Sequence, residues 1–149
     1  MTATMTSRAD PGLNADIGAL ITEFCWRVDG GEGDRVAELF TEDATLSTPH
    51  FTLTGRQEIH AWFTERADPT KRLSRHFWTN LRVTAEGDGR YTAQAYAMTV
   101  VGTPPAPVAG AAVAMGVSTD VVRIVDGRPL FASRRLDLTF QGRLEAQAA

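Results

Sequence analysis

The sequence predicts a single α+β domain in which three N-terminal helices cover one face of a curved antiparallel sheet and enclose a pocket. Two observations carry this prediction. Apolar residues recur at helical spacing in the first half of the chain, and they alternate with polar residues in the second half. Helices followed by a run of strands are typical of α+β folds. We therefore expect a half-open cone with a small-molecule cavity between sheet and helices.

Three amphipathic segments make up the helical half. The first has Asn14 as its N-cap and ends at Asp29, before two glycines. The second is short and carries its apolar residues on one side, at Val36, Leu39 and Phe40. The third opens at residues 54–57, which match a capping box, and stops at Asp68-Pro69.

At residue 73 the spacing of the apolar residues changes from a period of 3.6 residues, typical of helices, to a period of 2 residues, typical of strands. A short strand is predicted before the third helix, and four long strands after it, at residues 46–53, 73–85, 90–101, 114–125 and 130–140. Glycine-aspartate turns join the long strands in pairs, and a loop rich in proline, glycine and alanine spans residues 102–110. We expect one domain over residues 14–142, with flexible tails at 1–13 and 143–149.

The composition argues against several classes of function. A chain of 149 residues with 43% hydrophobic residues can bury a substantial core. A net charge of -3 argues against a nucleic-acid binder, which would carry a basic patch. Cys25 is the only cysteine, so neither a disulfide framework nor a cysteine zinc site is expected. Three histidines without metal-ligand spacing predict no metal site.

The same sequence contains no targeting signal that we can identify. No apolar run approaches the roughly 18 residues that a membrane span needs, and residues 1–12 lack the apolar region of a signal peptide. We therefore expect a cytoplasmic protein without a membrane partner. Only Lys71 among the 15 basic residues is a lysine, and this arginine bias indicates a GC-rich bacterial genome.

Asp29 and His76 are the candidate catalytic pair, although they lie far apart in the sequence. An imidazole oriented by a carboxylate can act as a general base near neutral pH. Each residue also has a structural interpretation: His76 as a hydrogen-bonded strand histidine, and Asp29 as a turn residue before Gly30. An acid at a helix C-terminus is unfavourable for the helix dipole, which hints that another contact selects it.

The strand at residues 73–85 predicts one wall of the pocket. Its alternation places one group of side chains on a polar face, namely His76, Trp78, Asn80 and Arg82, and a second group on the apolar face, namely Phe77, Leu81 and Val83. The next strand carries a row of small residues, Ala93, Ala95 and Ala97, which either leaves room for a ligand or allows close helix packing.

Asp120 is a mid-strand acid that must be paired or reach water. Two interpretations are open: a second acid/base group, or a salt bridge to Arg134 or Arg135, which we favour. The candidate substrate-binding residues are then Trp78, Asn80, Trp62, Phe24, Ala97 and Asp120.

The chain resembles the nuclear transport factor 2-like (cystatin-like) superfamily, in its SnoaL-like bacterial branch, from about residue 15 to residue 140. The resemblance is carried by the three helices, by the closing strands, and by the segments GDRVAELFTEDA at 33–44 and HFWTNLRV at 76–83. It implies the cone-shaped fold, a hydrophobic small-molecule substrate without a cofactor, and a homodimer packed through the sheet.

Two enzyme types of this branch are similar around the candidate pair. The chain resembles lindane dehydrochlorinase around Asp29 and His76, which implies that His76 abstracts a proton while Asp29 orients its ring. It resembles scytalone dehydratase at His76-Phe77.

The chain also departs from both enzymes. Ala97 stands where the dehydratase has a second histidine, and Trp26 where it has a helical aspartate. Phe24 stands where the dehydrochlorinase has a lysine, and Arg123 is near the place of its catalytic arginine. The resemblance therefore implies a different substrate.

From these residues we expect a small cofactor-free lyase or isomerase, dehydratase- or cyclase-like, that removes a proton from a hydrophobic small molecule. Two alternatives are open. One is a non-catalytic ligand-binding or assembly module of the same fold, such as a dioxygenase small subunit. The other is an epoxide hydrolase or polyketide cyclase-like enzyme that uses carboxylates, for which Asp120 would matter more than His76.

Overall fold

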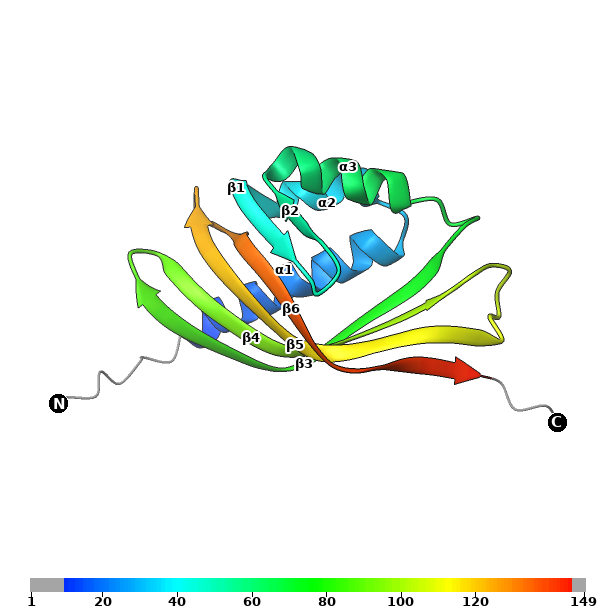
Figure 1. Ribbon diagram of the computed structural model, residues 1–149. Coiled ribbons are helices and arrows are strands. Elements are labelled where there is room, and N and C mark those ends of the chain that lie inside the picture. Colours follow the sequence, from blue (N-terminus) through cyan, green and yellow to red (C-terminus); the bar gives the residue numbers. More distant parts are fainter. Residues whose placement is uncertain (1–9, 146–149) are drawn as a thin grey trace.

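The computed structural model describes residues 10–145, which form three α-helices, one short 3₁₀-helix and six strands (Figure 1). The helices are α1 (Pro11–Asp29), α2 (Gly33–Val36), η1 (Ala37–Leu39) and α3 (Arg56–Arg66). The strands are β1 (Phe40–Ser47), β2 (Thr52–Thr54), β3 (Leu73–Gly87), β4 (Arg90–Gly102), β5 (Gly110–Val125) and β6 (Arg128–Glu145). The predicted α+β class, with helices before a curved sheet, is confirmed.

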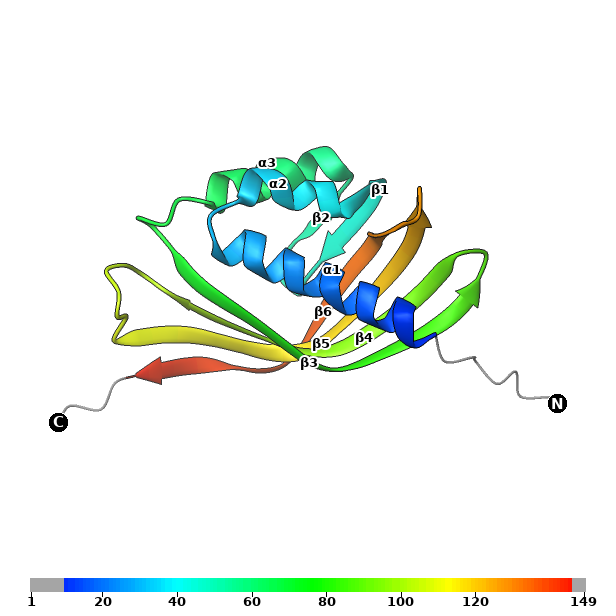
Figure 2. The same cartoon turned by 180° about the vertical axis from the view of Figure 1, so that it is seen from behind.

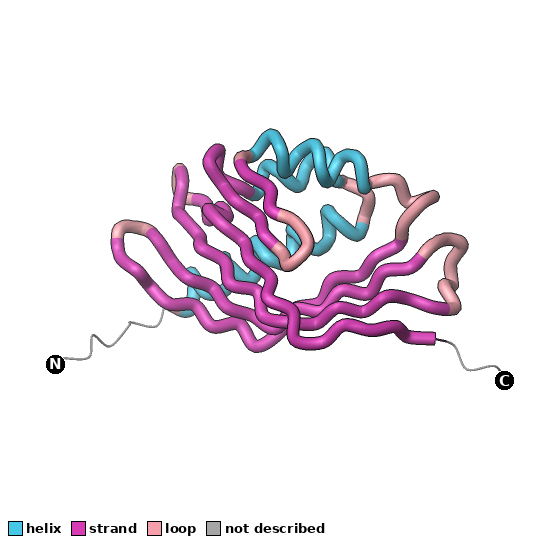
Figure 3. Tube along the Cα trace, viewed as in Figure 1, coloured by secondary structure: helices cyan, strands magenta, loops and turns pink. Residues whose placement is uncertain are grey.

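The six strands form one open sheet in the order β2-β1-β6-β5-β4-β3 (Figure 3). It is mixed rather than antiparallel throughout, because β1 runs parallel to β6. The four long strands are antiparallel to one another, as predicted. Register shifts at Met115/Gly116 and Val121/Val122 interrupt the pairing of β5 with β6, and bulges of this kind bend a sheet.

The core lies between the helices and the side of the sheet that curves toward them. Figure 2 shows α1 lying along this side of the long strands. The apolar stripe of α1 is buried against side chains from the sheet and from α3, with the cluster including Ile17, Leu20, Ile21, Phe24, Phe40, Ile59, Val122 and Phe131. Burial of each large apolar side chain contributes about 1.5–3 kcal/mol, which fixes α1 on the sheet.

The starts of α1 and α3 differ from their predictions. Helix α1 begins at Pro11 and not near Asn14, because Asp10 accepts a hydrogen bond from the main-chain N of Gly12 at 3.1 Å and proline suits the first helical position. No capping box opens α3. Its N-cap is Gly55 at φ +85°, and the Glu58 carboxylate accepts the main-chain N–H of Thr54.

The strand ends also differ. The predicted strand at 46–53 is two strands, β1 and β2, joined by a turn that contains Pro49, since proline cannot donate to a ladder. The last strand extends to Glu145, so the predicted tail at 143–149 is partly strand, and the predicted tail at 1–13 is helix from Pro11. The remainder of both tails, residues 1–9 and 146–149, lies outside the described residues.

A bulge in β3 overturns the predicted division of its two faces. Asn80 has φ +57°, and the pairing with β4 shifts register between Thr79 and Arg82. One extra residue moves the following side chains to the opposite face. Leu81 and Val83 therefore pack into the core on the same side as Trp78, whereas Phe77 is 53% exposed.

Candidate functional site

Asp29, the last residue of α1, accepts three hydrogen bonds from Ser74 and His76 near the start of β3. Nδ1 of His76 lies 2.6 Å from Oδ1 of Asp29, and the main-chain N of His76 lies 2.7 Å from Oδ2. The hydroxyl of Ser74 donates to Oδ1 at 2.8 Å. The two residues singled out from the sequence therefore meet, because α1 ends where β3 begins to pair.

The surroundings of this pair keep the carboxyl ionised. Burial by itself would raise the pKa of Asp29, but the His76 ring, its main-chain N–H and Ser74 together lower it below the ordinary value of 3.8. A carboxylate only accepts hydrogen bonds, so it selects the tautomer of His76 with the proton on Nδ1. Nε2 of His76 then carries the lone pair that can accept a proton.

A cavity of about 250 Å³ lies between the helices and the sheet and is bordered by His76. Aromatic side chains form much of its wall: Phe24 from α1, Trp62 and Phe63 from α3, and Phe51, whose ring stacks on Trp62 at a centroid distance of 4.3 Å. Asp29 does not line this cavity. His76 is therefore the member of the pair that borders the cavity, and Asp29 contacts it without bordering the cavity.

Sequence reasoning did not assign Arg134 of β6 to the cavity, although it named this residue as one possible partner of Asp120. Arg134 lines the cavity, and its guanidinium carbon lies 4.3 Å from the ring centroids of both Phe24 and Phe131. The ring of Phe24 also meets the ring of His76 edge to face, at 6.4 Å. The guanidinium and the imidazole thus flank the same phenyl ring.

Asp120 and Ser118 hold this arginine in place. Nε of Arg134 donates to Oδ1 of Asp120 at 3.0 Å, and Nη2 donates to Oγ of Ser118 at 3.3 Å. Burial raises the pKa of Asp120, which is 1% exposed, while Arg134 and Ser118 act in the opposite direction. Among the described residues, Nη1 of Arg134 is buried and has no hydrogen-bond partner.

The salt bridge interpretation of Asp120 is therefore the one that the geometry favours, with Arg134 and not Arg135 as the partner. Asp120 does not line the cavity. A buried mid-strand acid requires a buried cation, and that requirement was the one signal in the sequence that pointed to Arg134.

The other candidate residues divide into two groups. Phe24, Trp62 and Ala97 line the cavity. Trp78 does not: its Nε1 donates to Oγ1 of Thr22 at 3.1 Å, and the ring packs between α1 and β3. Asn80 also lies outside the cavity.

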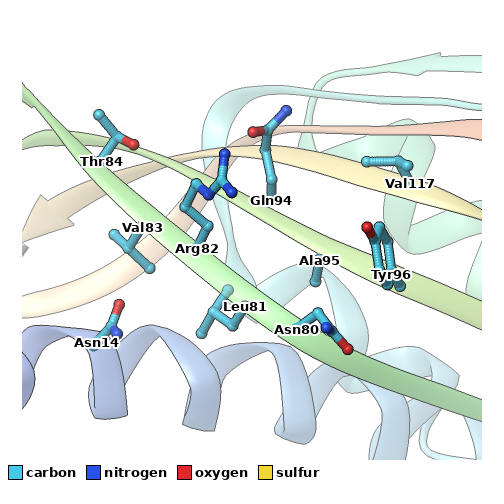
Figure 4. Close-up of a pocket in the computed structure, with 10 residues that line it drawn as sticks. All are labelled: Asn14, Asn80, Leu81, Arg82, Val83, Thr84, Gln94, Ala95, Tyr96 and Val117. Atoms are coloured by element: carbon cyan, nitrogen blue, oxygen red, sulfur yellow. The ribbon is translucent and has the colours of Figure 1, made fainter. Parts of the chain in front are cut away.

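Asn80 borders a separate hollow of about 870 Å³ along β3 and β4 (Figure 4). This hollow extends from Asn14 of α1 to Val117 of β5, and none of its lining residues is a histidine or an acid. Arg123, the residue nearest to the place of the dehydrochlorinase arginine, pairs instead with the exposed Asp43 at 3.5 Å. The hollow is larger than the cavity, but it does not contain the Asp29–His76 pair.

Two further features concern residues 10–145 as a whole. No group of three histidine, cysteine or acidic side chains in this range is arranged to hold a metal ion. No helix in the same range is long and apolar enough to cross a membrane.

Comparison with known proteins agrees with this architecture. The profile of the SnoaL-like domain matches residues 13–135. The chain belongs to the SnoaL-like domain family. A search of curated proteins finds no match to this SnoaL-like domain.

Solved structures show the same fold at low identity. A putative scytalone dehydratase from Novosphingobium aromaticivorans is 20% identical, with a TM-score of 0.76 over 91% of this chain and 89% of the other. A hexachlorocyclohexane dehydrochlorinase is 17% identical, with a TM-score of 0.77 over 93% and 94%. ActVI-ORFA from Streptomyces coelicolor is 24% identical, with a TM-score of 0.74 over 85% and 97%. These likenesses establish the nuclear transport factor 2-like, or cystatin-like, fold of the SnoaL-like domain.

Proposed function

We propose that this protein is a small lyase or isomerase that acts without a cofactor on a hydrophobic cyclic molecule, with His76 as the general base. The observation that carries the proposal is the 2.6 Å contact between Asp29 and His76 at the edge of an aromatic cavity. A base oriented in this way contributes about 10²- to 10⁴-fold to a rate. Cavities for drug-sized ligands span roughly 300–1,000 Å³, so a volume of about 250 Å³ suits one or two rings.

In the proposed reaction, Nε2 of His76 takes a proton from a carbon next to a carbonyl or next to a carbon that bears a leaving group. The electron pair of the broken C–H bond forms a C=C bond or an enolate. In an elimination, the leaving group departs with its own bonding pair, and a hydroxyl leaving group takes up the proton from the His76 imidazolium to form water. Asp29 stabilises the imidazolium that results.

Arg134 supplies the second element of the mechanism. Negative charge develops on the carbonyl oxygen or the leaving group as the proton leaves, and a fixed donor aimed at that charge lowers the barrier. The guanidinium of Arg134, which lines the cavity and whose Nη1 has no partner among residues 10–145, would be such a donor, and its pairing with Asp120 keeps it in position. The names of two structural neighbours, a dehydratase and a dehydrochlorinase, are consistent with elimination chemistry.

The alternative with carboxylate catalysis has less support. Asp120 is 1% exposed, engaged by Arg134 and Ser118, and absent from the cavity wall. The alternative of a non-catalytic binding or assembly module predicts a collapsed cavity or separated Asp29 and His76. Neither is observed.

The experiment that tests the proposal is a screen of one- and two-ring β-hydroxy ketones, in which dehydration is followed by the absorbance of the conjugated product. Deuterium exchange into 2-tetralone, a bicyclic ketone with acidic α-protons, gives a second readout. His76→Ala should lower either rate about 10²- to 10⁴-fold. His60→Ala, which removes an exposed histidine of α3, serves as the control. Near wild-type rates in His76→Ala would remove the base assignment.

The same proposal includes a homodimer that pairs through the sheet face opposite the helices. The side chains at four paired positions form an apolar row across β3–β6, namely Phe77, Met98, Met115 and Phe140. Phe77 and Phe140 are 53% and 66% exposed, and Phe77 alternates with Trp78, which packs against the core. The helices cover one side of the sheet in both ribbon views (Figures 1 and 2). A two-fold axis through this row would bury it in a self-complementary interface.

A further inference from the structure

The cavity is lined by positive charge in a protein whose net charge is negative. Its ionisable lining residues are Arg66, Arg72, His76, Arg134 and Arg135. No aspartate or glutamate lines it among the residues that the structure describes. The whole chain has 18 acidic and 15 basic residues, so the positive charge of the cavity lining does not follow from the composition of the chain. A concave surface of one sign concentrates ligands of the opposite sign.

Two of these four arginines already have carboxylate partners. Arg134 pairs with the buried Asp120, and Arg135 pairs with Asp137 at 2.9 Å. Within residues 10–145, Arg66 and Arg72 have no carboxylate within 4.0 Å. These two are the arginines that remain available to a ligand.

Arg66 and Arg72 are both held beside the aromatic wall and the catalytic pair. The guanidinium of Arg66 lies 4.0 Å above the ring of Trp62, and its exposure places this end of the cavity at the solvent. Arg72 donates to Oγ of Ser74 at 3.1 Å, and Ser74 in turn donates to Asp29. A chain of contacts therefore connects Arg72 to Asp29 and His76.

Arg66 and Arg72 line the same cavity, and their positive charges repel each other. Burial lowers the pKa of Arg72 and the charge of Arg66 lowers it further, against a smaller opposite effect of Asp29. A half-buried guanidinium beside a second one, without a carboxylate on either, is an unfavourable arrangement in the free protein. A carboxylate bound between them would relieve the repulsion and accept the planar donors of both.

We infer that the substrate carries a carboxylate that Arg66 and Arg72 bind at the mouth of the cavity, with its ring system against Trp62 and Phe51. This inference rests on the proposed function and specifies the class of substrate: a one- or two-ring organic acid. The anchored carboxylate fixes the acidic C–H near Nε2 of His76, which is the kind of positioning that makes a proton transfer effectively intramolecular.

The test compares the binding of 2-naphthoate and 2-naphthamide by titration calorimetry at low salt. The two probes share ring and shape and differ in charge. We expect naphthoate to bind roughly tenfold or more tightly than naphthamide, because charge-assisted hydrogen bonds are the strong ones. Arg66→Gln and Arg72→Gln should each remove most of this preference. Arg128→Gln, an exposed arginine at the start of β6, should keep it.

Absence of a preference for naphthoate in the wild type, or its persistence in both cavity variants, would overturn the inference. Arg66 is exposed and its guanidinium lies over the ring of Trp62, so Arg66→Gln reports on binding without a threat to folding. Because His76→Ala should lower turnover and retain the naphthoate preference, failure of the base assignment and failure of the carboxylate site give different results.

Discussion

Asp29 holds His76 by both its ring and its main chain, with Oδ1 at 2.6 Å from Nδ1 and Oδ2 at 2.7 Å from the main-chain N. This bidentate contact joins the end of α1 to the start of β3 and fixes the imidazole orientation from two sides. The side chains of His76 and Asp29 are 20% and 10% exposed, so solvent screens the pair much less than it screens a surface salt bridge.

We expect Asp29→Asn to lower turnover by about 10²-fold or more. The amide of asparagine can donate to Nδ1, which favours the opposite tautomer and places the proton on Nε2, where the base must accept one. The measurement is the steady-state rate with the best compound from the ketone screen. Asp16→Asn, an exposed acid of the same helix, is the matched control. Equal rates for Asp29→Asn and the wild type would contradict a catalytic pair.

The lowered pKa of Asp29 predicts a specific pH dependence of stability. The folded state holds this proton less tightly than the unfolded state, whose value is near 3.8. The stabilisation is therefore complete above that ordinary value and is lost as pH falls through the lowered folded pKa. Urea unfolding of wild type and Asp29→Asn across this acidic range should show the difference in unfolding free energy shrink toward low pH. A constant or growing difference would contradict the assignment.

Arg134 should have separable structural and functional roles. Arg134→Met leaves Asp120 buried without a cationic partner, and removal of one member of a buried ion pair costs about 3–5 kcal/mol of unfolding free energy. The double variant Asp120→Val/Arg134→Met removes both charges and should recover most of that stability in urea unfolding. Its turnover should stay low, because the free guanidinium donor is still missing. Recovery of turnover together with stability would show that Arg134 acts only in folding.

Substitution of Phe140 by glutamate should convert the proposed dimer into a monomer. A charge at the β6 end of the apolar row of β3–β6 would be buried without a partner in a two-fold interface. Light scattering after size-exclusion chromatography measures the mass directly. Val125→Glu, at an exposed apolar position in the β5–β6 hairpin and outside the row, should retain the wild-type mass. A monomeric wild type would exclude the dimer at the concentration used.

The placement of Asp29 shows what local patterns can and cannot reveal. An acid at a helix C-terminus typically opposes the helix dipole by about 0.3–1 kcal/mol, and this mild cost marked the residue in the sequence. The hydrogen bond to His76 offsets this cost, and His76 lies 47 positions further along the chain. No local pattern carries that contact, because it depends on how α1 lies across the sheet.

The β3 bulge is the clearest failure of sequence pattern. Strict alternation assigns Asn80 to the face of His76. In the structure Asn80 has a left-handed conformation within a bulge that holds one extra residue, so each later side chain of β3 lies on the opposite face from the one predicted. Asparagine tolerates this conformation better than most residues, but residue type alone does not locate a bulge: Asn14, the other asparagine, lies in α1. Trp78 was misplaced for a related reason: its contact with Thr22 belongs to the packing of α1.

The sequence by itself determined the α+β class, the helical first half, the four long strands and the identity of the candidate pair. These features follow from local periodicity and residue type, which act over a few neighbouring positions. Only the tertiary structure decided that Asp29 reaches His76, that Arg134 joins the cavity through Asp120, and that β1 runs parallel to β6. Such relations depend on helix packing and strand register, which arise when distant segments bury their apolar faces together.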